Sequence, residues 1–320
     1  MEFYNRNYSE RDVKRIILFI IFLLIVTSGR ASSSKIPDEI DKVVIKAMDQ
    51  GMIPGLSLAL IDGTSVTYKN YGVSQKGGNV RITSETLFEI GSCTKSFTAL
   101  AVMKLTMEKK IDLDQYVSTY IPWLRFKFNG NPYEVTLRQF LQHTSGLGKE
   151  TLALIPASTD EKALEQLVRK FENYELKFQP GERFEYASIN YDILGFLVQC
   201  ISGENFGDYL KNQIFYPLQM TSTQFGIPGT FNMAKGHKPG FFKAKEFLAP
   251  EYRGNWPSGY VISNTEDMVK FLGATIGTGW TGIDSLITFT GDFSYTNTFE
   301  DRYAYGWKVH AKKDFFFIPG

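Results

Sequence analysis

The hydrophobic and polar positions of the first third of the chain predict one helix followed by a β-hairpin. Residues 35–50 carry apolar side chains at three- and four-residue spacing, which is typical of a helix with one buried face. Residues 55–61 form a short β-type run, and residues 66–73 alternate as a return strand. The Asp62-Gly63 pair between them is a hairpin-turn signal, so an antiparallel sheet begins here.

The middle of the chain is predominantly helical, and strand signals return toward its end. The helix predicted from Ser92 to about Lys109 has no polar face over residues 99–103, which indicates a buried central helix. Short amphipathic helices are predicted over residues 136–142 and 160–171, and a longer apolar helix over residues 191–201. Residues 303–310 and 315–318 are rich in aromatic and β-branched residues and predict a second hairpin.

This order of elements predicts an α/β fold of the α+β sandwich kind. One antiparallel sheet is expected to combine residues 36–110 with residues 251–320 and to be flanked by helices. A mostly helical part, residues 111–250, is expected as an insertion.

The composition is sufficient for a folded core and argues against nucleic-acid binding and zinc chemistry. Hydrophobic residues make up 43% of the 320 residues, with 26 Phe and 17 Tyr, which is enough to build a core. The formal charge of +1 supplies no cationic field for nucleic acid. Three scattered histidines form no metal-ligand motif, so a zinc hydrolase is not expected. The two cysteines, Cys93 and Cys200, are expected to be buried free thiols.

The N-terminus has the pattern of an export signal. Basic residues precede an uninterrupted apolar run from Ile16 to Val26, and small polar residues follow it. Eleven helical residues reach about 16 Å, roughly half of a hydrocarbon core, which disfavours an ordinary spanning helix. Residues 1–31 are therefore predicted to be a cleaved signal peptide or an N-terminal membrane anchor. Either alternative places the rest of the chain outside the cytoplasm, secreted or anchored to the cell membrane.

The segment Ser92-Cys93-Thr94-Lys95 can carry nucleophilic chemistry. A serine and a lysine at positions i and i+3 of a helix lie on the same face, so the amine can reach the hydroxyl. The helix N-terminus favours a developing alkoxide. The same spacing occurs at Ser32 and Lys35, but only Ser92 opens a buried helix. The alternative for Ser92 is an ordinary capping serine with a solvated lysine one turn later.

Several segments together resemble the serine β-lactamase-related family, which includes class C β-lactamases, penicillin-binding DD-peptidases and related esterases. The resemblance spans about residues 36–320. The segments that carry it, in the family's order, are residues 88–99, 111–114 with 120–122, 136–147, 179–191 and 255–260. It implies an acyl-enzyme mechanism without a cofactor, in which Ser92 is the nucleophile and Lys95 takes its proton.

The resemblance also implies roles for the segment that follows Gly181. Tyr186 takes the place of the tyrosine in the family's Tyr-x-Asn motif, a phenol that exchanges protons with the nucleophile and the leaving group. Ser188 stands where the family usually has Asn, which puts substrate positioning in doubt, and the nearby Asn190 is a candidate to compensate. His143 lies in a segment that is a structural turn in the family, so a Ser-His mechanism is not expected.

The end of the sequence departs from the family. The third motif, Lys-Thr-Gly or His-x-Gly, supplies an oxyanion-hole donor, and Phe315–Gly320 either leads into it or fills its place without a cationic side chain. The C-terminus therefore looks truncated or degenerate, and losing one donor costs about 100- to 1000-fold in rate.

Three functional hypotheses follow from these residues. The first is an exported serine hydrolase that acts on D-Ala-D-Ala peptides, such as peptidoglycan stem peptides, on β-lactams or on small esters. The second is a weak or inactive family member that binds envelope peptides or lactams. The third is an incomplete reading frame without a stable fold. In the first two, the partner is a small-molecule or peptide substrate, and only the N-terminal segment contacts a membrane.

Overall fold

The structure is a computed structural model that describes residues 36–227, 232–238, 245–247, 249–275, 301–310 and 315–317. The predicted export segment, residues 1–31, and the residues after Phe317 lie outside these ranges. Within the ranges, no helix combines the length and the apolar character that a membrane crossing needs.

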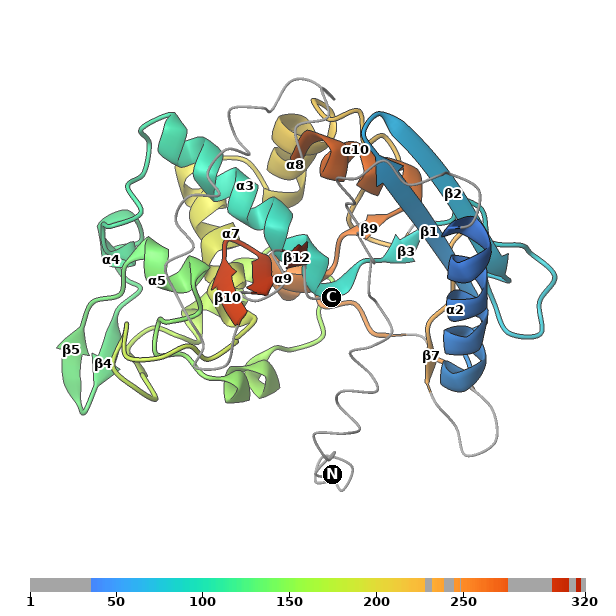
Figure 1. Ribbon diagram of the computed structural model, residues 1–320. Coiled ribbons are helices and arrows are strands. Elements are labelled where there is room, and N and C mark those ends of the chain that lie inside the picture. Colours follow the sequence, from blue (N-terminus) through green and yellow to red (C-terminus); the bar gives the residue numbers. More distant parts are fainter. Residues whose placement is uncertain are drawn as a thin grey trace.

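The first elements confirm the predicted helix and hairpin. Helix α2 (Ile36–Gly51) is followed by strands β1 (Gly55–Asp62) and β2 (Ser65–Gly72), which pair antiparallel along their whole length. The helix lies beside this hairpin (Figure 1), and its Asp41 accepts hydrogen bonds from Lys69 Nζ at 2.7 Å and from the Tyr71 hydroxyl at 2.5 Å.

The other helices are short except for α3, α7 and α10. They are α3 (Thr94–Met107), α4 (Val117–Tyr120), α5 (Leu137–Leu141), α6 (Ala163–Arg169), α7 (Ile189–Ser202), α8 (Phe206–Leu210), α9 (Trp256–Gly259) and α10 (Thr265–Thr275). Short 3₁₀ helices occur at η1 (Gly91–Cys93), η2 (Lys149–Leu154) and η4 (Arg253–Asn255), and a π-helical turn at η3 (Lys211–Phe215).

The described strands form several small sheets. The remaining strands are β3 (Phe88–Glu89), β4 (Phe126–Phe128), β5 (Asn131–Tyr133), β6 (Tyr174–Glu175), β7 (His237–Lys238), β8 (Lys245–Glu246), β9 (Ile262–Ser263), β10 (Asp301–Ala304), β11 (Trp307–His310) and β12 (Phe315–Phe317). The pairing of β11 with β12 confirms the predicted C-terminal hairpin. The single strand predicted over residues 303–310 is wrong, because a turn at Tyr305 and Gly306 divides it between β10 and β11. Across the described ranges, these strands and the β1–β2 hairpin belong to separate sheets, and residues 276–300 between α10 and β10 are not described.

Helix α3 is the centre of the molecule, as its apolar sequence predicts. Every residue from Thr94 to Val102 is buried, so the helix packs on all sides. Its Phe97 ring lies 5.4 Å from the ring of Phe215 in η3 and 4.4 Å from that of Phe271 in α10. The ribbon shows α3 running between the helical part and the β1–β2 hairpin (Figure 1), so α3 joins the two parts.

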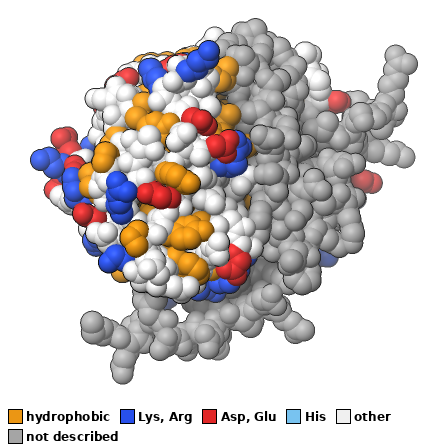
Figure 2. Space-filling model, turned by 90° about the vertical axis from the view of Figure 1, so that its left-hand side faces the viewer, with side chains coloured by type: hydrophobic (Ala, Val, Ile, Leu, Met, Phe, Trp, Pro, Cys, Tyr) orange, Lys and Arg blue, Asp and Glu red, His pale blue; other side chains and the backbone are white. Residues whose placement is uncertain are grey.

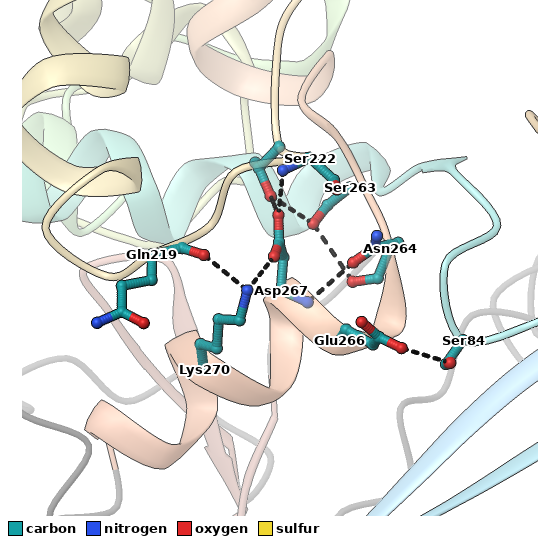
Figure 3. Close-up of polar contacts among 9 residues, drawn as sticks. Ser84, Gln219, Ser222, Ser263, Asn264, Glu266, Asp267 and Lys270 are labelled. Carbon is teal, nitrogen blue, oxygen red and sulfur yellow. Dashed lines mark hydrogen bonds and ion pairs between the residues drawn. The ribbon is translucent and has the colours of Figure 1, made fainter. Parts of the chain in front are cut away.

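A buried aspartate fixes α10 against the chain before β9. Asp267 is 1% exposed and accepts hydrogen bonds from the Ser222 N–H at 2.8 Å, from the Thr223 hydroxyl at 2.9 Å and from Lys270 Nζ at 2.7 Å. The same amine donates to the Gln219 carbonyl at 2.6 Å. Figure 3 shows these groups converging on the Asp267 carboxylate, which is therefore paired as a buried charge must be.

The β10–β11 hairpin packs directly on the first turn of α3. Its turn residue Gly306 has φ +88°, and a Cβ atom there would lie 2.6 Å from the backbone N and Cα of Ser96. The neighbouring Tyr305 hydroxyl accepts a hydrogen bond from Arg138 Nη1 at 3.0 Å. Arg138 also pairs with Asp114 at 2.7 Å, so the hairpin is tied to the helical part as well.

The outer face of the helical part carries charges of both signs. Figure 2 shows hydrophobic side chains on this face interspersed with basic and acidic ones. This mixture agrees with the nearly balanced formal charge of +1.

The contact between Gly306 and α3 can be tested by adding one methyl group. Gly306→Ala is expected to lower the free energy of unfolding by about 3 kcal/mol, because the methyl group meets backbone atoms and the positive φ is strained. Gly63→Ala is the matched control, since Gly63 has φ +57° with nothing within 4 Å of the added atom, and about 1 kcal/mol is expected. Urea unfolding measures both, and equal losses would contradict the described contact.

Candidate active site

The predicted serine and lysine lie at the start of α3. Gly91 has φ +53°, which turns the chain into η1 and brings Ser92 to the head of the helix. Lys95 is fully buried, and its Nζ donates a hydrogen bond to Ser92 Oγ at 3.0 Å, while Ser92 itself is partly exposed. The hydroxyl is therefore open to a substrate on one side and held by the amine on the other.

The segment around α9 holds the lysine from the opposite side. Lys95 Nζ also donates to the backbone carbonyl of Ser258 at 2.5 Å. Helix α3 is fastened to this segment on both sides of the lysine: Thr94 Oγ1 accepts from the Val261 N–H at 3.0 Å, and the Thr98 hydroxyl donates to the Pro257 carbonyl at 2.6 Å. These contacts fix the position of the amine.

Tyr186 approaches the same amine from the loop before α7. Lys95 Nζ lies 5.0 Å from the centre of the Tyr186 ring, and Tyr186 is partly exposed. Among the described residues, the Tyr186 hydroxyl forms no hydrogen bond with the protein. The structure therefore brings together the three groups singled out by the sequence, namely the Ser92 hydroxyl, the Lys95 amine and the Tyr186 phenol.

A buried polar cluster of His143, Asn190 and Ser145 packs against the Tyr186 ring. The imidazole of His143 packs against that ring in a tilted arrangement, with centroids 4.4 Å apart. Its Nδ1 lies 2.9 Å from Asn190 Nδ2 and accepts a hydrogen bond from the Ala187 N–H at 3.3 Å. The side-chain oxygen Oδ1 of Asn190 accepts a hydrogen bond from the Ser145 hydroxyl at 2.6 Å. Burial, together with the charges of nearby lysines, lowers the pKa of His143 well below its ordinary value, so the imidazole is neutral.

The two residues expected to bind substrate are placed differently. Asn190 is fully buried, and both ends of its amide are engaged in the cluster with His143. The structure therefore does not bring it to Ser92. Ser188 is partly exposed at the start of α7, two residues beyond Tyr186, and its side chain forms no capping hydrogen bond.

The cysteines are free thiols, as expected, but only one is buried. Cys93, which follows Ser92 in the sequence, is 2% exposed, and burial raises its pKa to about 12, so it is a protonated thiol rather than a competing nucleophile. The expectation that Cys200 is buried is wrong. Cys200 is exposed because it lies on the outer side of the last turn of α7, beyond the buried stretch that ends at Val198.

A second buried aspartate lies behind the lysine, and the sequence reasoning missed it. Asp192 on α7 has no exposed surface, and its Oδ2 accepts a hydrogen bond from Asn255 Nδ2 at 2.6 Å. Burial raises the pKa of Asp192 to about 7, although the Ser258 hydroxyl, the charge of Lys95 and the Asn255 amide act in the opposite direction. The available signal was an acidic residue inside an otherwise apolar helix.

Comparison with known proteins identifies the family. The family model "Beta-lactamase" matches residues 40–320. The chain belongs to the β-lactamase family. It is 31% identical over 239 residues to Protein flp of Staphylococcus aureus strain N315, a match that covers 73% of this chain and 48% of that protein. The chain thus spans about half the length of the curated relatives it matches.

Solved structures confirm the α/β fold of this β-lactamase-family chain. The octameric penicillin-binding protein homologue from Pyrococcus abyssi has a TM-score of 0.74 at 25% identity, covering 86% of this chain and 65% of that one. The D-alanine carboxypeptidase AmpC from Burkholderia cenocepacia has a TM-score of 0.74 at 22% identity, covering 87% and 75%. Family and fold together support a serine hydrolase of the β-lactamase or DD-peptidase type.

The third motif of the β-lactamase family is expected beyond β12. The strand predicted to lead into it is present as Phe315–Phe317, while residues 318–320 lie outside the described residues. Within the part of the chain that is described, no group of His, Cys, Asp or Glu side chains could hold a metal ion.

The buried Asp192 predicts a pH dependence of folding stability. Its pKa is about 7 in the folded chain against an ordinary value of 3.8, so folding takes up a proton between these two pH values. The stability that Asp192 contributes is present below about pH 4 and is lost as the pH rises to about 7, with a total of about 4 kcal/mol. Thermal unfolding from pH 4 to pH 8 is expected to show this loss in the wild type and a flatter profile in Asp192→Asn. If the stability of the wild type and of Asp192→Asn changed in parallel with pH, Asp192 would not be the group responsible for the loss.

Proposed function

We propose that this β-lactamase-family chain is a serine hydrolase that acts on amide or ester carbonyls through an acyl-enzyme. Ser92 is the nucleophile, and Lys95 with Tyr186 moves its proton. The observation that carries this proposal is the fully buried Lys95 amine 3.0 Å from the partly exposed Ser92 hydroxyl at the head of α3. A serine alkoxide needs a base within this distance, and a helix N-terminus stabilises its negative charge.

The reaction consists of two acyl transfers. Ser92 Oγ bonds to the substrate carbonyl carbon, its proton passes to Lys95 and Tyr186, and the bond from that carbon to the leaving nitrogen or oxygen breaks as the leaving atom takes the proton. Water then attacks the Ser92 ester, the acid product departs and the serine hydroxyl is restored. The partly exposed Tyr186 hydroxyl suits the exchange with the leaving group, because no protein hydrogen bond occupies it among the described residues.

The substrate class follows from the carbonyl chemistry and from the relatives. One structural relative is a D-alanine carboxypeptidase, which supports D-Ala-D-Ala peptides, such as peptidoglycan stem peptides, as substrates. β-Lactams and small esters present the same reacting carbonyl. We also infer that residues 1–31 carry the chain out of the cytoplasm as a cleaved signal or an anchor, where such peptides occur. The inference rests on the basic and apolar pattern of that segment.

A second candidate is a family member that binds these ligands with little turnover. Ser188 replaces the asparagine of the second motif, and the Asn190 amide is already engaged with Ser145 and His143. The chain thus has a short hydroxyl where the family positions substrate with an amide. The two candidates differ in the release of the acyl group, which an experiment can separate.

Covalent labelling tests the nucleophile. Wild-type chain is expected to react with a fluorescent penicillin or a fluorophosphonate, and Ser92→Ala is expected to lose the label completely. Lys95→Met and Tyr186→Phe are expected to slow labelling by about 100-fold or more, because each removes a proton acceptor. Gel fluorescence against time measures these rates.

Ser96→Ala is the matched control, since Ser96 lies one turn further along α3 and its hydroxyl donates to the Cys93 carbonyl at 2.7 Å. It is expected to label like the wild type. Equal labelling of wild type and Ser92→Ala would refute the proposal. Hydrolysis of a chromogenic lactam or ester then separates the two candidates, because a binder retains the acyl group while an enzyme releases it.

A further inference from the structure

The buried carboxyl of Asp192 has no part in the mechanism above, yet it is connected to the lysine by an unbroken chain of contacts. Asn255 Nδ2 donates to Asp192 Oδ2 at 2.6 Å and to the Ser258 hydroxyl at 2.5 Å. The Ser258 hydroxyl in turn lies 3.3 Å from the Asn255 carbonyl. The backbone carbonyl of the same Ser258 accepts from Lys95 Nζ at 2.5 Å. Asp192 therefore holds the Asn255 amide in place, Asn255 holds Ser258, and the Ser258 carbonyl holds the Lys95 amine.

Burying the Asp192 carboxyl costs free energy that a residue with only a packing role would not require. It has no exposed surface, and its second oxygen, Oδ1, has no hydrogen-bond partner among the described residues. A buried carboxyl with one unsatisfied oxygen destabilises the fold, and a role toward another group is one explanation for its presence. Among the described residues, the charge that acts on Asp192 is that of Lys95 on α3, and the charge of Asp192 in turn acts on Tyr260, just after α9. Lys95 is the cation among these groups.

We propose that Asp192 is a positioning residue for Lys95: it holds the Ser258 carbonyl in place and, when ionised, stabilises the protonated amine. The consequence for catalysis rests on the proposed function. An amine that must be deprotonated to accept the Ser92 proton becomes available at higher pH when an ionised carboxylate lies nearby. Asp192 then sets the pH at which the nucleophile is activated, without touching the substrate.

The pH profile of acylation tests this role. The rate of labelling of Ser92 by a fluorescent penicillin or a fluorophosphonate is measured from pH 5 to pH 9 in the full chain. Asp192→Asn keeps the size of the side chain and removes the charge, and its acid limb is expected to move to lower pH by about one unit. A merely structural role lowers the yield of folded protein but leaves the midpoint where it is in the wild type.

Asp267→Asn is the matched control. Asp267 is also a buried aspartate, but its hydrogen bonds go to Ser222, Thr223 and Lys270 (Figure 3), away from the Lys95 contacts. This variant is expected to be less stable than the wild type and to retain the wild-type midpoint. Superimposable profiles of wild type, Asp192→Asn and Asp267→Asn would overturn the proposed role of Asp192 while the function of Ser92 stood.

A second measurement does not depend on acylation. The ¹³Cε resonance of Lys95, assigned by its loss in Lys95→Arg, is titrated in the wild type and in Asp192→Asn. The midpoint is expected to be lower in Asp192→Asn by about one unit. An unchanged midpoint overturns the inference even if no probe labels Ser92. A lowered midpoint in a chain that no probe labels supports the inference and refutes only the proposed function.

Discussion

The burial of one lysine amine constrains most of this structure. A cationic side chain without exposed surface is stable only when acceptors surround it, and Lys95 finds two, the Ser92 hydroxyl and the Ser258 carbonyl. To provide them, the first turn of α3 must lie against the segment around α9, although 163 positions separate Lys95 from Ser258. The hydrogen bonds at Thr94 and Thr98 and the cover by the β10–β11 hairpin follow from the same requirement. The features that bury the amine are thus the features that place it beside the serine.

Much of this arrangement could be predicted from the sequence, because it depends on local patterns. The spacing of Ser92 and Lys95 places both on one face of a helix, and the apolar run of α3 indicates a buried helix, which the structure confirms. The first hairpin follows from strand alternation and an Asp-Gly turn. Tyr186 could be placed only by resemblance to a family, since no local pattern brings residue 186 to residue 95.

What the sequence could not supply are the tertiary surroundings of polar residues. The sequence suggests that Asn190 compensates for the serine that replaces the motif asparagine. In the structure, however, the Asn190 side-chain amide contacts Ser145 and His143 inside the fold. Cys200 was expected inside and lies outside, because the last turn of a helix can leave the core. The two buried aspartates show the same limit. Asp267 is surrounded by donors and fastens α10, whereas Asp192 has one unsatisfied oxygen close to a catalytic candidate, and nothing in their sequence neighbourhoods separates the two cases.

The contact between Gly306 and Ser96 also bears on the order in which the molecule is assembled. The hairpin that covers the first turn of α3 is synthesised more than two hundred residues after that turn. A nascent chain that has emerged only as far as α7 already contains the serine, the lysine and the tyrosine. It still lacks the Ser258 carbonyl, which accepts from the amine, and the hairpin that packs on the first turn of α3. Such long-range closure is slow compared with helix formation. The serine and the lysine therefore acquire the surroundings described above only after the β10–β11 hairpin has been synthesised and has folded onto α3.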